Sequence, residues 1–588
     1  MNPDGRMSAL AAAVLVVAMF ALPLAGNAYL TTFAFTILIS FVLAQSWDWV
    51  AGEMGYINLG HFVFYGFGAY TFCILLTRGV PLPACFAGAA IITLAVATAL
   101  AFPLFRLRDD YFAFATLALI PLAELLAYNL DSLTNGAIGL SLPPVYVLQP
   151  AYYIAGVLVV ITAAATLLLR RSRFGHALRG IRNDEQAAET VGVRTYPGKL
   201  SVLLLSAVFA GMAGAVQAWQ MSYIDPPTVF GLNVALIPIA MALFGGSGLL
   251  WGPLVGVLLL AIAQQWLLAH VQTLQATIYG LAILLIGRFM PGGILRAPWI
   301  ARLRGERAPG QQPAHEESAS TPTPQFAASI ELPLPRRSAN RSRTLLECRG
   351  LTMAFGGNIA VNDVNLSIAE GEIVGLVGSN GSGKTTLFNC ISKVFEPVHG
   401  NMLLDGTSLR GLRRDQVSNL GVGRTYQIPR PFSDLTVREN IAMPLMFRAG
   451  EPLPPQSALA EAVQFAEFSN LSHRLDTVAD ALSLQEKKAL EFARALACRP
   501  RLLLVDEVAS GLTPAEVRRF VDHIRDIRDA YGITVIWIEH IFSALSRIVD
   551  RLIVMDNGIV IADGPLDVVI RDERVLKSYL GSAAEHAA

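Results

Sequence analysis

The sequence predicts a multi-domain fold, a polytopic α-helical membrane domain of about eight to ten spans followed by an α/β domain of the phosphate-loop class. Apolar residues make up 53% of the 588-residue chain and are concentrated in its first half. Charged residues make up only 15%, against about 25% in typical soluble domains. A glycine-rich phosphate-binding motif then occurs at Gly378–Thr386. The chain is also too long for one compact domain.

Composition divides the chain into four segments. Residues 1–296 are almost all apolar and form the expected membrane domain. Residues 297–344 are rich in Pro, Ser and Arg and poor in aromatic residues. Such a stretch buries too little apolar surface to offset its ordering entropy, so we expect a flexible linker. Residues 345–583 have the composition of a soluble α/β domain, and residues 584–588 form a short tail.

About ten apolar stretches of the first segment are long enough to cross roughly 30 Å of hydrocarbon. The exact number is open, because residues 46–60 could form a re-entrant segment. The first stretch has the look of a signal peptide but no clear cleavage site, so we expect a membrane helix there too. The expected spans lie near residues 7–24, 29–45, 61–78, 84–104, 111–130, 151–169, 200–221, 232–248, 250–268 and 273–288.

Basic residues between these stretches indicate the orientation of the chain. They cluster at residues 106–108, 170–199 and 288–304. Loops rich in Lys and Arg favour the cytoplasmic side of a membrane. About ten spans with the N-terminus inside put all three clusters on that side. We therefore expect a multi-pass protein of the cytoplasmic membrane, with its α/β domain in the cytoplasm.

The charge gives no support to nucleic-acid binding, and the cysteines give none to metal binding. The formal net charge is +0, so nothing in the bulk electrostatics favours nucleic acid as a partner. The five cysteines show no metal-ligand spacing, and we expect them to be reduced, packed thiols.

Three residues are candidates for a transport path. The run Gly-Gly-Ser-Gly that starts with Gly245 and Gly246 predicts a broken helix, whose freed backbone groups can contact a solute. Glu124 lies inside an apolar stretch, where a carboxylate has to be paired, protonated or turned to a wet cavity. Close helix packing and a hydrogen bond to a neighbouring helix are the structural alternatives. Asp48 and Glu53 we place at the membrane interface.

A buried-strand pattern at residues 373–377 leads directly into the glycine-rich motif. Strand, loop and helix in this order are the context that a phosphate loop requires. Its glycines let consecutive N–H groups point at phosphate oxygens, and the N-terminus of the next helix adds its positive end. Lys384 would reach the β- and γ-phosphates, and the Thr385 hydroxyl would bind Mg²⁺. The nucleotide-binding candidates are Gly378, Ser379, Asn380, Gly381, Ser382, Gly383, Lys384, Thr385 and Thr386.

Two further strand patterns end in residues suited to catalysis. Residues 502–505 lead into Asp506 and Glu507. Asp506 is suited to hold the Mg²⁺ shell, and Glu507 to polarise a water for attack on the γ-phosphate. Residues 533–538 lead, one residue later, into His540. We interpret His540 as a γ-phosphate sensor because its strand belongs to the same series.

Taken in order, these motifs resemble the ATPase subunit of an ABC transporter over residues 345–583. The resemblance implies ATP and Mg²⁺ as cofactors and an adenine ring stacked on Phe355. Gln427 matches the glutamine that senses Mg²⁺ and meets the membrane domain. Segments 511–514 and 575–581 are more specific and resemble the branched-chain amino acid uptake subfamily. The resemblance makes Glu507, His540 and Gln427 the candidate catalytic residues, and Thr385, Gln427 and Asp506 the candidate metal ligands.

The signature loop of that family, Leu-Ser-Gly-Gly-Gln, is degenerate in this chain. It would begin at Leu482, and Ser483 remains while both glycines are gone. The family uses glycine N–H groups there to clasp the γ-phosphate held by the opposite subunit. Gln485 crowds this approach, and Glu486 places a carboxylate near phosphate charge. We therefore expect two unequal ATP sites in a dimer, and a partner ATPase with an intact signature.

The membrane half is similar to the branched-chain amino acid permeases over nearly all of residues 25–296. Segments 55–70, 107–117 and 244–253 carry the similarity. Residues 174–192 match the coupling helix of the family, and their pattern predicts a short amphipathic helix that docks on a protein. The coupling candidates are Arg173, Phe174, Gly175, Asp184, Glu185 and Ala188.

Two modules that are usually separate subunits, a permease and an ATP-binding subunit, thus resemble parts of one bacterial importer of branched-chain or related small amino acids. The resemblance implies a lipid bilayer, a second permease subunit, a second ATPase subunit and a secreted, periplasmic binding protein as partners. Two alternatives stay open. One is an importer of urea, short amides or other small amphiphilic acids. The other is a membrane-tethered regulatory ATPase that moves no solute.

Overall fold

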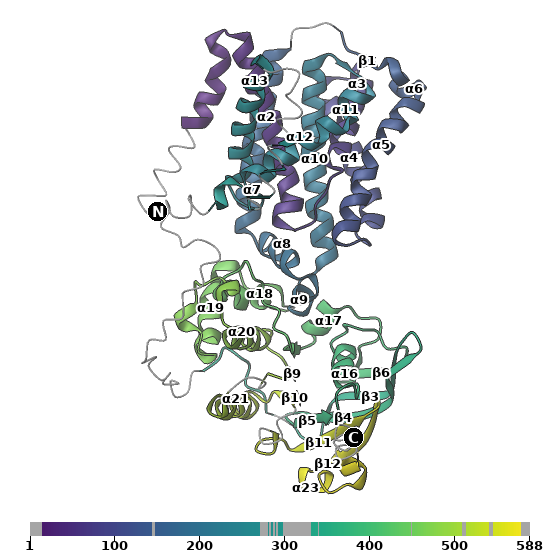
Figure 1. Cartoon of the computed structure of the whole chain (residues 1–588), viewed down its shortest axis with the longest axis vertical. Coiled ribbons are helices and arrows are strands. Elements are labelled where there is room, and N and C mark those ends of the chain that lie inside the picture. Colours follow the sequence, from purple (N-terminus) through teal and green to yellow (C-terminus); the bar gives the residue numbers. More distant parts are fainter. Residues whose placement is uncertain are drawn as a thin grey trace. The chain divides into compact units, whose positions relative to one another are not determined.

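The computed structural model describes residues 14–143, 147–270, 280–281, 284–285, 288–289, 292–297, 331–338, 340–448, 450–508, 513–539 and 545–577 (Figure 1). The chain forms two compact units. Unit 1 comprises Met1–Arg182 and Tyr196–His315, and unit 2 comprises Asn183–Thr195 and Glu316–Ala588. The predicted architecture, a helical membrane domain followed by an α/β domain, is confirmed.

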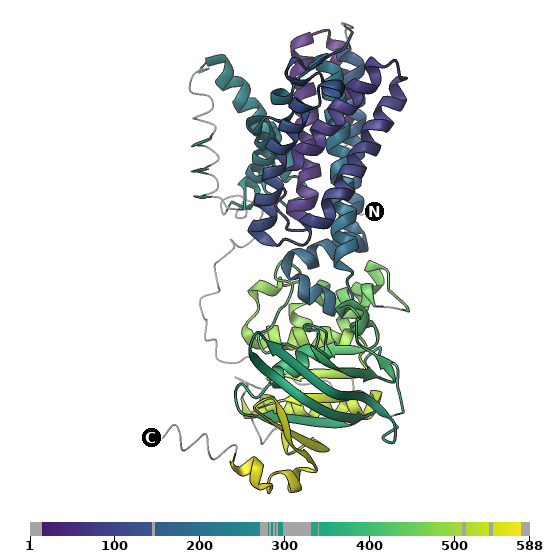
Figure 2. The same cartoon turned by 90° about the vertical axis from the view of Figure 1, so that its right-hand side faces the viewer.

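Unit 1 is a bundle of apolar helices (Figures 1 and 2). Many of its large apolar side chains are exposed, which suits helices surrounded by hydrocarbon rather than water. Its main helices are α2 Ala28–Asp48, α3 His61–Thr77, α4 Leu82–Leu104, α5 Asp109–Asn129, α6 Asp131–Thr134, α7 Leu148–Arg171, α8 Arg173–Asn183, α10 Thr195–Met221, α11 Pro226–Phe230, α12 Leu232–Gly245 and α13 Gly252–His270. A two-residue antiparallel pairing joins β1 Leu140–Ser141 to β2 Tyr223–Ile224.

Six helices of the described part of unit 1 are long and apolar enough to span a membrane. The spans expected near 61–78 and 250–268 are shorter helices, α3 and α13. The span expected near 7–24 is described only from Val14, and most of the one near 273–288 lies outside the described residues. The first half of residues 46–60 is helical, because α2 continues to Asp48 and then into one π-helical turn, Trp49–Glu53.

The glycine run interrupts the helical path of unit 1 as the sequence predicts. Helix α12 ends at Gly245 and α13 begins at Gly252. Between them Gly246 has φ 120° and Gly248 has φ 74°, values that residues with a side chain rarely adopt. A Cβ atom at Gly245 would collide with the backbone of Gly252, so the break also depends on close backbone approach.

Unit 2 contains two sheets with helices packed on them. The six-stranded sheet has the order β12-β11-β5-β10-β9-β8, and all of its pairings are parallel except that of β11 with β12. Its strands are β5 Ile373–Gly378, β8 Val422–Arg424, β9 Leu502–Asp506, β10 Thr534–Ile538, β11 Arg551–Asp556 and β12 Ile559–Gly564. Every residue of β5, β9 and β10 is buried, as expected of parallel strands covered on both faces.

The second sheet is antiparallel, with the order β4-β3-β6-β7, and its long strands run as green ribbons in Figure 2. Its strands are β3 Thr344–Phe355, β4 Asn358–Ala369, β6 His399–Leu404 and β7 Thr407–Ser408. The main helices of unit 2 are α9 Glu185–Thr190, α16 Lys384–Ile391, α17 Arg414–Asn419, α18 Val437–Phe447, α19 Pro455–Phe468, α20 Leu484–Ala497, α21 Pro514–Tyr531 and α23 Leu566–Val569.

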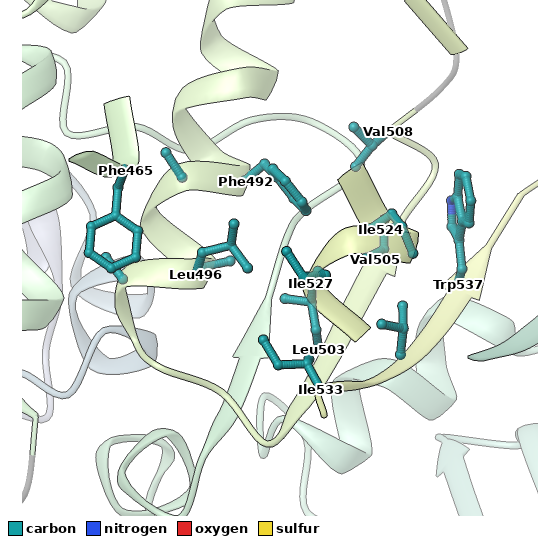
Figure 3. Packing of buried hydrophobic residues seen from close by; sticks show 14 of the residues in the cluster. Phe465, Phe492, Leu496, Leu503, Val505, Val508, Ile524, Ile527, Ile533 and Trp537 are labelled. Carbon is teal, nitrogen blue, oxygen red and sulfur yellow. The ribbon is translucent and has the colours of Figure 1, made fainter. Parts of the chain in front are cut away.

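The parallel sheet separates two hydrophobic cores. Because side chains alternate across a strand, Leu503 and Val505 of β9 enter one core while Leu502 and Leu504 enter the other. Figure 3 shows the first core, which contains Trp537 of β10 together with Phe492 and Leu496 of α20 and Ile524 and Ile527 of α21. The continuous apolar runs that predicted these strands are thus explained by burial on both faces.

Residues 331–338, which the sequence places in the linker, pack on unit 2. Leu332 and Leu334 belong to its first core and are 4% and 8% exposed. The backbone N–H of Leu332 donates to the hydroxyl of Tyr531, at 2.7 Å. We call residues 331–338 the strap. Burial of two alternate leucines holds the strap on unit 2, even though the composition around them is polar.

Replacing Leu334→Ala removes a buried side chain from this strap. We expect the free energy of unfolding of unit 2 to fall by about 2 kcal/mol, which is a decrease of about 4–8 °C in Tm for a domain of this size. Thermal unfolding of the purified chain in detergent measures this change. Arg336→Ala is the matched control because Arg336 is exposed and its ion pair with Glu331 lies at the surface. Equal Tm values for the two variants would contradict the packing of the strap.

Candidate functional site

The phosphate-loop motif connects β5 to α16. Strand β5 ends at the buried Gly378, and α16 begins at Lys384. Gly378, Gly381 and Gly383 have φ values of 154°, 81° and 99°, and a Cβ atom at Gly378 or Gly383 would collide with a carbonyl oxygen of a neighbouring segment. The spacing of these glycines in the sequence therefore reflects both positive φ and close backbone approach.

The Lys384 ammonium is folded into this loop. Its Nζ donates to the carbonyl oxygens of Gly378 at 2.9 Å and Ser379 at 2.7 Å, and to Oγ of Ser382 at 3.2 Å. Burial lowers the pKa of Lys384, and two nearby carboxylates partly offset that effect. The loop thus places one cation among its own backbone groups.

A cavity of about 270 Å³ lies beside the loop. It brings together residues that are distant in the sequence, since Gln427 and Glu507 share it with the glycine-rich motif. The lining residues are Ala360, Asn380, Gly381, Gly383, Lys384, Thr385, Thr386, Gln427 and Glu507.

Asp506 is the last residue of β9 and is 1% exposed. Its Oδ2 lies 3.6 Å from the guanidinium of the buried Arg424. Its Oδ1 is also buried and has no hydrogen-bond partner among the described residues. Burial raises the pKa of Asp506 to about 6, against the attraction of Arg424. An unpartnered carboxylate oxygen beside a phosphate loop fits a hard divalent cation.

Glu507 has a strained backbone and a defined partner. Its φ of 46° is unusual for a residue with a side chain, and such strain gathers at functional sites. Its backbone N–H donates to the carbonyl of Ile538 on β10, at 3.0 Å. Nε2 of Gln427 donates to Oε2 of Glu507 at 2.5 Å. Two predicted catalytic residues are thus in direct contact.

Comparison with known proteins identifies the two units. Residues 29–287 match the family described as branched-chain amino acid transport system / permease component, and residues 361–510 match the family ABC transporter. The high-affinity branched-chain amino acid transport ATP-binding protein BraF of Pseudomonas aeruginosa is 36% identical over 254 residues, which are 41% of this chain and all of that protein. The corresponding protein LivG of Escherichia coli is 34% identical over the same shares.

The chain belongs to the branched-chain amino acid family of ABC transporters. It joins a permease component and an ATP-binding component in one polypeptide. Among solved structures, a nucleotide-free ATP-binding cassette from an ABC transporter is 28% identical, with a TM-score of 0.37, and the match covers 40% of this chain and 98% of that one. Because the ABC transporter match falls at residues 361–510, unit 2 contains the ATPase domain of the transporter.

Four other predicted nucleotide contacts, Phe355, Gly378, Ser379 and Ser382, do not line the cavity. Phe355 ends β3 and is 44% exposed. Its ring meets Phe395 edge-on, with 5.0 Å between the centroids, and it is not among the residues that line the cavity. His540 lies outside the described residues.

Glu491 of α20 contacts the segment that carries Gln427, a contact that we did not predict from the sequence. Its buried carboxylate accepts from the backbone N–H groups of Tyr426 and Arg430, each at 3.0 Å. Burial raises the pKa of Glu491 to about 7, against the attraction of Arg494. The transporter thereby anchors the segment that carries Gln427. The signal in the sequence was the position of Glu491 between the apolar residues Leu490 and Phe492, which predicts a buried carboxylate that needs partners.

The degenerate signature forms the N-terminus of α20. Leu482 is buried, and Ser483 is the N-cap, whose Oγ accepts from the N–H of Glu486 at 3.3 Å. In return, Oε2 of Glu486 accepts from the N–H of Ser483 at 2.8 Å, which completes a capping box. Oε1 of Glu486 accepts from Arg474 at 2.9 Å. Gln485 is exposed. The carboxylate of Glu486 thus contacts its own helix start and forms an ion pair with Arg474.

The expected coupling segment forms two helices instead of one. Arg173, Phe174 and Gly175 open α8, where Gly175 is buried. A second helix, α9, follows, and its N-cap Asp184 accepts from the N–H of Ala187 at 2.9 Å. Asp184 separates the helices because its extended backbone and side-chain cap end one helical path and begin another.

Helix α9 packs within unit 2 of the transporter. Ala188 is fully buried, and Nη1 of Arg414 donates to Oε2 of Glu189 at 3.0 Å. Nη1 of Arg430 donates to Oδ2 of Asp184 at 3.4 Å. Further contacts of this segment join Gln186 to Arg430, Asn183 to the backbone N–H of Asp434, and Arg194 to Asp415. Glu185, the first residue of α9, is half-buried.

The three candidates for a transport path lie at two places in unit 1, on α5 and at the end of α12. Glu124 is half-buried on α5. Gly245 and Gly246 form the first part of the break between α12 and α13, as described above. Asp48 and Glu53, which we expected at the membrane interface, are 0% and 3% exposed. Asp48 accepts from Ser247 and Gly248, and Glu53 pairs with Arg170.

The raised pKa of Asp506 predicts a pH-dependent response to Mg²⁺. A metal ligand has to be deprotonated, so we expect the stabilisation by Mg²⁺ and ATP to decline as the pH falls through about 6. Without metal the sign reverses: the contribution of Asp506 to stability is full below its ordinary pKa of 3.8 and is lost as the pH rises through about 6. Thermal unfolding between pH 5 and 8, with and without Mg²⁺ and ATP, measures both trends. Asp506→Asn is the control, and an equal pH response in this variant would refute the assignment.

Proposed function

We propose that this chain imports branched-chain or related small amino acids across a bacterial cytoplasmic membrane, driven by ATP hydrolysis. The observation that supports this most strongly is the match of both units, independently, to components of the same transport system. A permease component and an ATPase in one chain favour coupled transport over a regulatory ATPase. The ATPase unit would lie in the cytoplasm, where ATP is available.

The phosphate loop would bind ATP through its backbone N–H groups, Lys384 and the N-terminus of α16. Thr385, Gln427 and the unpartnered oxygen of Asp506 would hold Mg²⁺. When bound, Mg²⁺ would neutralise charge on the phosphates. Thr385 and Gln427 line the cavity beside the loop, and Asp506 directly precedes Glu507, which lines the cavity too.

Glu507 is placed to orient and polarise the attacking water. Its contact with Gln427 ties this role to a segment that Glu491 anchors to α20. A displacement of Glu507 during hydrolysis would therefore move the segment of Gln427, and through Glu491 it would move α20, the helix that begins at the signature. His540 would sense the γ-phosphate, as the family resemblance implies.

The signature of this chain would serve the opposite ATP site poorly. The N–H of Ser483 already donates to Glu486, and two side chains larger than hydrogen, Leu484 and Gln485, stand where the family has glycine. We therefore propose a heteromeric complex with a second ATPase whose signature is intact. A second permease subunit and a secreted, periplasmic binding protein would complete it.

Helix α9 would carry force between the ATPase and the permease. Its ion pair with Arg414, its contact with Arg430 and the burial of Ala188 give it a firm seat in unit 2. Since α8 precedes it directly in the chain, a displacement of α9 would pull on the permease. Closure of the ATPase pair by ATP needs only a few kcal/mol of differential binding to shift such a two-state equilibrium.

Uptake of radiolabelled leucine into proteoliposomes that contain the complete complex and binding protein tests this proposal. We expect accumulation that requires ATP. Accumulation of urea or a short amide in place of leucine would change the substrate class. ATP hydrolysis without uptake of any such solute would favour a regulatory ATPase and refute the proposal.

Replacing Glu507→Gln preserves the size of the side chain and removes its basic carboxylate. We expect hydrolysis by the complex to fall about 10²–10⁴-fold, with ATP binding retained, because the site on this chain would perform nearly all turnover. Phosphate release and nucleotide binding are measured on the same preparation. Glu467→Gln, an exposed residue far from the cavity in sequence, is the control. Residual hydrolysis near half of the unaltered rate would contradict the inequality of the two sites.

Reversing the charge of Glu189→Arg places two guanidinium groups opposite each other. We expect uptake by the complex to fall about tenfold, a typical coupling between sites, while the ATPase unit still binds nucleotide. Adding Arg414→Glu should restore part of the uptake, since the ion pair is rebuilt in reverse. Arg410→Glu, an exposed residue shortly before α17, is the control. Loss of uptake in that control, or no loss in Glu189→Arg, would contradict the role of this contact.

A further inference from the structure

Four charged side chains of unit 1 meet next to the break between α12 and α13. We call Asp48, Glu53, Arg170 and Arg182 the charged latch. They come from the end of α2 and its π-helical turn, the last turn of α7, and α8. Both carboxylates are almost completely buried.

The latch holds both backbone groups of one residue of the break, Gly248. Oδ1 of Asp48 accepts from the N–H of Gly248 at 2.9 Å and from Oγ of Ser247 at 2.6 Å. Arg170 donates to the carbonyl oxygen of Gly248. The break is therefore attached to α2 by its N–H and to α7 by its C=O.

The remaining contacts are one ion pair and one backbone contact. Nε of Arg170 lies 2.5 Å from Oε1 of Glu53, and Nη1 of Arg182 donates to the carbonyl oxygen of Gly52 at 2.5 Å. Arg170 thus pairs with Glu53 while it also holds Gly248. Burying charge among apolar helices is unfavourable without such pairing, and apolar side chains would join these helices at least as stably.

The backbones of α2 and the break approach each other closely at the latch. A Cβ atom at Gly52 would collide with Oδ1 of Asp48 and with the N–H nitrogen of Gly248. A Cβ atom at Gly248 would meet Arg182 and the carbonyl oxygen of Gly52. Two glycines on different elements are therefore required for the same contact.

A small cavity of about 50 Å³ lies between the same elements. Gln45 and Thr166, which help to line it, stand one helical turn before Asp48 and Arg170, and Leu250, which also lines it, lies in the break two residues after Gly248. The chain segment that follows the latch thus has free space beside it. A close-packed contact would resist displacement of this segment.

Arg170 connects the latch to α8. It lies in the last turn of α7, and α8 begins at Arg173. Arg182 lies near the other end of α8, so both arginines of the latch flank this helix. A displacement of α8 would therefore act on Gly52 through Arg182, and on the carbonyl contact of Gly248 through Arg170, which lies three residues before α8.

We propose that the charged latch transmits displacement of α8 to the break between α12 and α13, and so controls the opening of the solute path there. Asp48 and Arg170 act as positioning residues that couple the break to ATP hydrolysis. The inference rests on the proposed transport function. It assigns to buried charges at the end of α2 a role in coupling rather than in solute binding.

The test uses the complete complex in proteoliposomes with the variants Asp48→Asn and Arg170→Gln. Asp48→Asn keeps the shape of the side chain and removes its charge. We expect uptake per ATP hydrolysed to fall at least about tenfold, while hydrolysis and thermal stability stay near those of the unaltered complex. Arg171→Gln is the matched control because Arg171 is the next residue and is exposed. Unchanged uptake per ATP in stable Asp48→Asn complexes would overturn the proposal.

A charge-reversed pair covers the case in which a single variant fails to fold. Glu53→Arg combined with Arg170→Glu should recover stability and part of the coupling that Glu53→Arg alone loses. Recovery of stability without recovery of uptake per ATP would show that the pair is only structural, and would overturn the proposal.

A second measurement separates this inference from the proposed function. A cysteine introduced by Leu249→Cys reports the position of the break through its rate of thiol labelling, and the native Cys73 and Cys85 of unit 1 are buried. We expect ATP with vanadate to change that rate in the parent and not after Asp48→Asn. A change in labelling rate without uptake of any solute would support the latch and refute the proposed transport. Equal responses in both backgrounds would refute the latch.

Discussion

Parallel pairing of β5, β10, β9 and β8 is the constraint on which the rest of unit 2 depends. Ile538 pairs with both Leu376 and Asp506, and Arg424 pairs with Leu504. The carboxyl ends of these strands therefore meet at one edge of the sheet, where ligands of open α/β folds bind. The phosphate loop follows β5, Glu507 follows β9 and the segment of Gln427 follows β8, so a register shift in any of these strands would separate groups that now share a cavity.

The fold was largely predictable because its signals are local. Continuous apolar strands, glycines at fixed spacing and long apolar helices each describe the surroundings of their own residues. The contacts of Asp48 were not predictable in this way, because its partners Ser247 and Gly248 lie about 200 residues further along the chain. Read alone, an acid at the end of an apolar run looks interfacial. Glu491 was missed for the same reason, since only the tertiary structure brings the N–H groups of Tyr426 and Arg430 to it.

Helix α20 illustrates how one element serves stability and chemistry with competing demands. Ser483 and Glu486 form a capping box that satisfies N–H groups at its start. A phosphate clasp needs those same donors turned outward. From the sequence we expected the carboxylate of Glu486 near phosphate charge, but in the structure it accepts from Ser483 and Arg474. The departure from the family pattern thus produces a well-capped helix with fewer free N–H donors. From the sequence we recognised only the loss of the two glycines.

The membership of Asn183–Thr195 in unit 2 has a practical consequence for dissecting the molecule. The polypeptide passes from one unit to the other at three points, so the ATPase is not a simple C-terminal appendage. A truncated fragment that starts after the linker would lack α9 and uncover the seat of Ala188, along with Arg414 and Arg430. A synthetic peptide of that segment would cover these residues again. The gain in solubility of the fragment when the peptide is added would then report how tightly α9 is held.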